Sequence, residues 1–117
     1  ILEKLINKVN FKEVIEMGSI GCKISSILRG ESDIYICLSL PGESSPKDWD
    51  FAAPAAVLKG AGGAITYLNN EDLTFGNSSF HQGGIIIASS NSNNHERICL
   101  EIKDVIYRYG LYPFNIN

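Results

Sequence analysis

Several residue types are scarce in this 117-residue chain, and each scarcity excludes a class of function. The two histidines are too few for a site built on several histidines. A net charge of -3, without a run of lysine or arginine, predicts no nucleic acid polymer and no membrane surface as a partner. No apolar stretch is long enough to span a bilayer, and we expect no signal peptide from the first residues given. The three cysteines match neither a disulfide framework nor a zinc site and indicate a reducing cytoplasm; they are Cys22, Cys37 and Cys99.

The length and the ordinary apolar content predict a single α/β domain over residues 1–117, with a packed core. The first nine residues already carry apolar side chains at helical spacing, with neither an initiator methionine nor a helix cap. We therefore expect the sequence to continue a longer protein.

The stretch 45–63 organises the chain. Asp48 and Asp50 precede a run of small residues that predicts a helix, and Pro54 is expected in its first turn because a proline further along would remove a hydrogen bond. Taken alone, this pattern favours Asp50 as a simple helix cap. The helix is expected to end at Gly62-Gly63, before a strand over 64–68.

A second stretch, 18–23, contains two glycines, a serine and a lysine between a predicted strand over 11–17 and a predicted helix ending near Gly30. Free N–H groups, the Ser19 hydroxyl and the Lys23 ammonium would together make an anion cradle. The spacing is not that of a Walker A loop. From the residues alone, a plain turn with Ser19 as helix cap is the favoured alternative.

The remaining elements are strands over 33–38 and 83–90, a short strand candidate over 73–75, and a final helix after Asn93 with a capping box to Glu96. Alternating strands and helices, with strands apolar throughout, predict a layered α/β sandwich: a mostly parallel or mixed sheet with helices on both faces. We interpret His81 as a surface or loop-packing residue, and His95 and Cys99 as ordinary helix residues.

The string Trp-Asp-x-Ala-Ala-Pro (49–54), followed by Leu-x-x-Ala-Gly-Gly (58–63), closely resembles the C-terminal signature of the inositol monophosphatase superfamily. Pro-Lys-Asp-Trp-Asp (46–50) is most similar to the 3′(2′),5′-bisphosphate nucleotidase branch. The resemblance implies that Asp50 is a ligand of the catalytic Mg²⁺. It also implies substrate contacts at Gly18, Ser19, Gly21 and Lys23.

Two further positions are weaker candidates for contacting the substrate. The position of Cys37 carries a Glu or an Arg that sets specificity in relatives, and a small buried hydrophobe is the alternative reading of this cysteine. Lys47 is placed to reach a phosphate, although a solvated loop lysine is the commoner outcome.

The resemblance covers the C-terminal half of the superfamily fold, and the metal-binding motif Asp-Pro-x-Asp-Gly-Thr of the other half is absent. We therefore expect the isolated chain to be a poor catalyst. The expected function is a Mg²⁺-dependent phosphomonoesterase that hydrolyses 3′-phosphoadenosine 5′-phosphate to AMP. Alternatives are an inositol or sugar phosphatase, and a non-catalytic binding or assembly module that forms a homo-oligomer over the face of the missing half. A generic nucleotide-binding domain ranks last, because it leaves the 49–50 signature unexplained.

Overall fold

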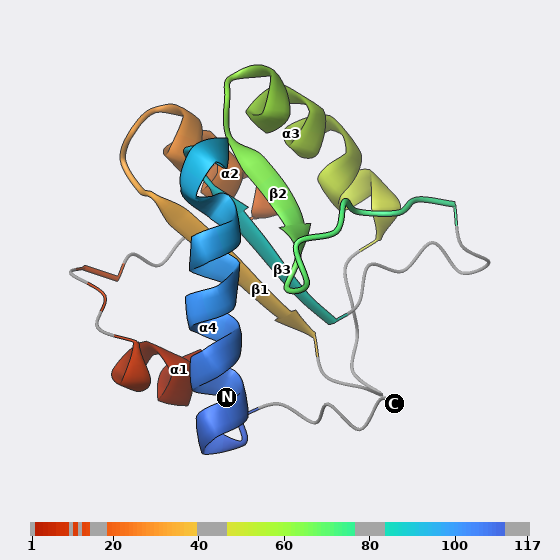
Figure 1. Ribbon diagram of the computed structural model, residues 1–117. Helices are drawn as coiled ribbons and strands as arrows, with labels where there is room; N and C mark the ends of the chain where they lie inside the picture. The colour runs from red at the N-terminus through yellow and green to blue at the C-terminus, as the bar shows by residue number, and fades with distance from the viewer. Residues whose placement is uncertain are drawn as a thin grey trace.

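Three strands form one sheet, and helices cover both of its faces (Figure 1). The computed structural model describes residues 2–9, 11, 13–14, 19–39, 47–76 and 84–111. Its elements in chain order are α1 (Leu2–Lys8), α2 (Ile20–Leu28), β1 (Ile34–Ser39), α3 (Asp48–Gly60), β2 (Ala64–Tyr67), β3 (Gly84–Ser89), a 3-10 turn (Ser92–Asn94) and α4 (His95–Tyr109). Within this described part, none of the helices is long and apolar enough to cross a membrane.

The sheet is antiparallel, which corrects the predicted mostly parallel or mixed sheet. Strand order is β1-β3-β2, and Ile87 of β3 pairs with Ile36 on one side and Thr66 on the other. β1 and β2 run in the same direction but are separated by β3, which runs against both. Unbroken apolar runs report burial on two faces and carry no information on strand direction, so the fold class was predictable while the pairing was not.

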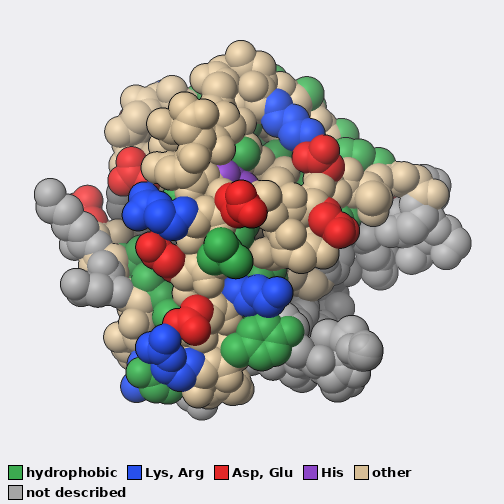
Figure 2. All heavy atoms as spheres, in the orientation of Figure 1, with side chains coloured by type: hydrophobic (Ala, Val, Ile, Leu, Met, Phe, Trp, Pro, Cys, Tyr) green, Lys and Arg blue, Asp and Glu red, His purple; other side chains and the backbone are tan. Residues whose placement is uncertain are grey.

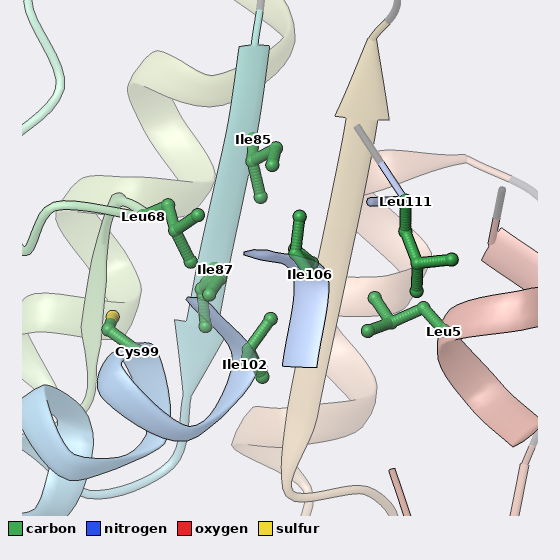
Figure 3. Close-up of a cluster of buried hydrophobic side chains, with 8 residues drawn as sticks. All are labelled: Leu5, Leu68, Ile85, Ile87, Cys99, Ile102, Ile106 and Leu111. Atoms are coloured by element: carbon green, nitrogen blue, oxygen red, sulfur yellow. The ribbon is translucent and has the colours of Figure 1, made fainter. Parts of the chain in front are cut away.

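The alternation of β3 divides the core into two clusters. Ile85 and Ile87 face α1 and α4, as Figure 3 shows, while Ile86 and Ala88 face α2 and α3. Fully burying a side chain of this size contributes roughly 1.5–3 kcal/mol. Because both faces of this short strand are buried, β3 is the element that joins the two helical layers. The prediction that helices cover both faces of the sheet is confirmed.

Helix α3 begins at Asp48, so Pro54 lies in its second turn and not in the first as predicted. Proline has no N–H to donate to the Asp50 carbonyl four residues earlier. Burial of Phe51 and Leu58 on the inner face of the helix offsets that loss. The expected left-handed end is present, because Gly62 has φ +93° just after the helix.

Two predicted strands are not found where the structure describes their residues. Leu73–Phe75 forms no strand; instead the Thr74 N–H donates to the Tyr67 hydroxyl at 3.1 Å, and the segment runs beside α3. For the strand predicted over 11–17, residues 11, 13 and 14 are not in a strand, and 12 and 15–17 lie outside the described residues.

The predicted capping box at the start of the last helix is also wrong. Asn91 caps a 3-10 turn by accepting the Asn93 N–H at 2.8 Å, and α4 then begins at His95. Gly110 closes α4 with φ +60°, as the sequence predicted.

The outer face of α4 is charged with both signs. Figure 2 shows basic and acidic side chains interspersed on this side of the molecule. Arg97 pairs with Glu101 at 3.7 Å and Arg108 pairs with Asp104, each one helical turn apart. Such exposed pairs contribute little to stability and mark a solvated surface.

Candidate functional site

The N-terminal ends of α2 and α3 lie at the same end of the domain. Helices α2 and α3 pack against each other along their length, and residues near the C-terminal ends of both line one pocket, so the two helices run in the same direction. The lining residues include Ile27, Leu28, Leu58 and Ala61. β1 and β2 each follow one of these helices and run back toward their N-terminal ends (Figure 1). Two helix N-termini therefore share one end of the sheet, where unpaired N–H groups favour an anion.

Ser19 is the N-cap of α2, as the residues alone predicted. Its backbone is extended and its Oγ accepts the Cys22 N–H at 3.2 Å. The bond uses an oxygen lone pair, so the hydroxyl proton of this exposed side chain stays available to a ligand. Gly21 lies in the first turn of the same helix, whereas Gly18 lies outside the described residues.

Lys23 is half-buried, and its ammonium lies over the ring of Tyr35 of β1, with Nζ 5.2 Å from the ring centroid. Cys37 follows two residues later on the same face of β1, also half-buried and packed against the cluster under α2 and α3. Burial, together with the neighbouring Cys37 thiol, raises the pKa of Tyr35 far above its usual range. The Tyr35 side chain that Lys23 contacts is therefore uncharged.

Asp50 occupies the third position of α3 and is not its N-cap. Its Oδ2 accepts the N–H of Lys47, the actual N-cap, at 2.9 Å, and the carboxylate is half-buried. In a capping box the N-cap side chain would also accept the Asp50 N–H. The Lys47 ammonium has no acceptor atom, so that second bond does not form. The half-buried Lys47 nevertheless lies at the same helix end as Asp50.

Asp48 was not predicted to hold the site together, and the structure gives it that role. The side chain is 9% exposed, and Oδ2 accepts the Gly76 N–H at 2.6 Å. At the other end of α3, Lys59 pairs with Asp72 at 3.4 Å. The part-buried Asp48–Gly76 bond therefore holds residue 76 against the first turn of α3, the turn that carries Asp50, whereas the exposed Lys59–Asp72 pair adds little.

The described residues do not by themselves fit a complete magnesium centre. Mg²⁺ prefers six oxygen ligands in octahedral geometry. Among the residues that the structure describes, no three His, Cys, Asp or Glu side chains come together. Asp50 offers one carboxylate at this end, so any further protein ligands would have to come from outside the described residues.

Of the predicted site residues, Ser19, Gly21 and Lys23 lie at the start of α2, and Lys23 contacts Tyr35 of β1, two residues before Cys37. Asp50 and Lys47 lie at the start of the neighbouring helix. His81 lies outside the described residues.

Residues 1–107 match the model of the inositol monophosphatase family. The chain belongs to this family. The resemblance inferred from the 49–54 and 58–63 segments is thereby confirmed. The chain is similar to the Golgi-resident adenosine 3′,5′-bisphosphate 3′-phosphatase of Mus musculus. The two are 28% identical over 102 residues, which are 82% of this chain and 27% of the relative.

Two other relatives of the inositol monophosphatase family are similar over shorter stretches. The 3′(2′),5′-bisphosphate nucleotidase 1 of Mus musculus is 30% identical over 88 residues, 74% of this chain and 27% of the relative. Inositol monophosphatase 3 of Xenopus laevis is 30% identical over 83 residues, 66% of this chain and 22% of the relative. The chain thus spans about a quarter of the length of each relative, and the names support the bisphosphate nucleotidase branch.

Proposed function

We propose that this chain forms one part of a Mg²⁺-dependent phosphomonoesterase that hydrolyses 3′-phosphoadenosine 5′-phosphate to AMP in the cytoplasm. The observation that carries the proposal is the shared end of α2 and α3, where Ser19 and Lys23 lie on one helix and Asp50 on the other. A phosphate monoester needs both kinds of group: donors for its oxygens and a carboxylate for a metal.

Each residue has a separate part in this proposal. The Ser19 hydroxyl, the N–H groups of the first turn of α2 and the Lys23 ammonium bind and orient the phosphate. Asp50 supplies one carboxylate ligand from the first turn of α3. When bound in the complete enzyme, Mg²⁺ would supply an activated water and stabilise the leaving oxygen. Because a single carboxylate does not hold such a centre, the isolated chain is expected to bind phosphates without turning them over.

The nucleotide is favoured as substrate because two of the three named relatives are phosphatases of bisphosphorylated nucleosides. The third, an inositol monophosphatase, supports a polyol or sugar phosphate as the second candidate. Cys37 does not discriminate between them, since it supplies neither a carboxylate for hydroxyl groups nor a cation for a second phosphate.

An assembly module of a different functional class is supported by the outer face of α3. Trp49 is 66% exposed and Val57 57% exposed, with small residues between them. An apolar helix face of this kind favours association with another surface. Self-association together with no phosphate binding would favour this alternative.

The test is an NMR titration of the ¹⁵N-labelled chain in Mg²⁺ with 3′-phosphoadenosine 5′-phosphate, and separately with inositol 1-phosphate. We expect the nucleotide to shift the amides of 19–23 at lower concentration than the inositol phosphate does. Asp50→Asn should remove the Mg²⁺-dependent shifts at the start of α3, while Asp104→Asn on α4 serves as the matched control and should leave them unchanged. Shifts spread over other surfaces, or release of phosphate by the chain alone at ordinary enzymatic rates, would contradict the proposal.

A substitution at Gly21 separates helix stability from ligand binding. A Cβ at this position would lie 3.8 Å from Ser19 Oγ, an ordinary contact, and alanine favours a helix over glycine by about 1 kcal/mol. Gly21→Ala should therefore raise the free energy of unfolding by about 0.5–1 kcal/mol and weaken nucleotide binding, because a methyl group would partly cover the backbone N–H groups that the phosphate would approach. Urea unfolding and the same titration measure the two effects. Ser25→Ala, further along α2, is the control and should leave binding unchanged; tighter binding by Gly21→Ala would contradict the close approach of the ligand.

A further inference from the structure

The lysine of the proposed phosphate site is held in place by an aromatic ring. Lys23 Nζ lies 5.2 Å from the centroid of Tyr35, within the distance at which an ammonium is attracted to the face of a ring. The backbone of Lys23 is also fixed, because its N–H donates to the Ser19 carbonyl at 3.1 Å in the first turn of α2. Both ends of this long side chain are therefore constrained.

The ring that contacts Lys23 is itself fixed by the sheet. Tyr35 belongs to β1, is paired with Ala88 of the central strand, and packs against the cluster that includes Ile24 and Phe51. Its hydroxyl remains protonated at physiological pH, since burial and the Cys37 thiol hold its pKa high. The attraction to Lys23 therefore comes from the ring face and not from a phenolate, so it does not depend on the hydroxyl.

We propose that Tyr35 is a positioning residue that holds the Lys23 ammonium beside the N-terminal end of α2, ready for the phosphate of the substrate. This inference rests on the proposed function of the same site. A free lysine side chain loses much rotational freedom when it binds a phosphate, and a lysine already resting on a ring has lost part of that freedom beforehand. Tyr35 acts through Lys23 and does not itself contact the substrate.

The first experiment needs no variant. In the folded chain, the ε-methylene protons of Lys23 should be shifted upfield by the ring current of Tyr35 and should show nuclear Overhauser contacts to its ring protons. Absence of both signals would overturn the proposal, because the contact would not exist in solution.

The second experiment measures binding of 3′-phosphoadenosine 5′-phosphate and of inorganic phosphate by NMR titration. Tyr35→Leu should weaken both about three-fold, and Tyr35→Phe, which keeps the ring face, should bind as the unmodified chain does. Lys23→Gln should weaken both about ten-fold, because it removes the charge-assisted bond. In the Lys23→Gln background, Tyr35→Leu should have no further effect.

A matched control exists on the opposite layer, where Lys103 Nζ lies 5.8 Å from the ring centroid of Tyr107. Tyr107→Leu removes a ring from a lysine in the same way and should leave phosphate binding unchanged. If Tyr35→Leu does not fold, as judged by circular dichroism, Tyr35→Met is the replacement. Binding that needs Lys23 but is unchanged in Tyr35→Leu would overturn the positioning role alone, whereas no binding by the unmodified chain would count against the proposed function.

Discussion

Replacing Gly63 by alanine is expected to lower the free energy of unfolding by about 3 kcal/mol. Gly63 lies between the end of α3 and the start of β2, where the helix turns back onto the sheet. A Cβ there would lie 2.6 Å from Leu58 Cδ1 and 2.7 Å from the Ser89 carbonyl oxygen. The leucine is itself 1% exposed, and the oxygen belongs to the central strand, so neither atom can move away without shifting an element.

Urea unfolding of Gly63→Ala measures this effect, and Gly60→Ala is its matched control three residues earlier. Apart from its chain neighbours and the backbone of α3, no atom of the described residues lies within 4 Å of a Cβ at Gly60, and this residue ends α3 without a positive φ. Gly60→Ala should be neutral or stabilise the protein by up to about 1 kcal/mol. A similar small effect in both variants would show that the junction between α3 and β2 is looser than the contacts at Gly63 indicate.

The sequence was sufficient for the elements whose signals are local. Apolar spacing, the Ser19 cap and the left-handed glycines predicted the described helices and the three paired strands to within a few residues. Strand direction could not be predicted from local sequence, because β3 lies between β1 and β2 and the residues of one strand do not indicate which strands pair with it. Pro54 misled the prediction of where α3 begins, because tertiary burial of Phe51 and Leu58 outweighed the loss of one helical bond.

The candidate site was likewise predictable only in part. Asp50, Ser19 and Lys23 were assigned through a resemblance in short segments, and the fold then placed their helices with the same ends together. The contacts that support them were missed, since the Asp48–Gly76 bond spans 28 residues and the Lys23–Tyr35 contact joins a helix to the following strand. Tyr35 left one usable signal, its position two residues before Cys37 on the same face of a strand. That signal places it beside the specificity position but does not identify its partner.

The second large effect concerns His95, which the sequence treated as an ordinary helix residue. It is 2% exposed and lies at the start of α4. Nδ1 lies 2.6 Å from Ser89 Oγ, and Nε2 lies 2.8 Å from Thr66 Oγ1. The Thr66 hydroxyl proton is already donated to the Tyr67 carbonyl at 2.8 Å, so Nε2 must donate to Thr66. Burial lowers the pKa of His95 and so favours the neutral ring, in which Nδ1 accepts from the Ser89 hydroxyl. The geometry thus assigns a neutral imidazole protonated at Nε2.

His95→Ala is expected to lower the free energy of unfolding by about 2–4 kcal/mol, because it opens a cavity and removes the buried partner of Ser89. Its control is Arg97→Ala on the exposed face of the same helix, which loses an ion pair to Glu101 and should change stability by less than about 0.5 kcal/mol. Urea unfolding at pH 7.5 compares the two. Equal effects would mean that the buried bonds of His95 contribute no more than a surface ion pair.

The same burial makes stability depend on pH with a defined sign. Desolvation lowers the pKa of His95 in the folded chain, whereas in the unfolded chain it titrates near 6.5. Between these two values the unfolded state binds the proton more readily, so stability is fully present above about pH 6.5 and falls as the pH decreases, with a slope of up to about 1.4 kcal/mol per unit. Because the chain holds a second histidine, the quantity to measure is the difference between the unmodified chain and His95→Gln in unfolding experiments from pH 7.5 to 5. That difference should shrink as the pH falls; if it stays constant, His95 takes up its proton as readily in the folded chain as in the unfolded one, and the buried neutral imidazole is wrong.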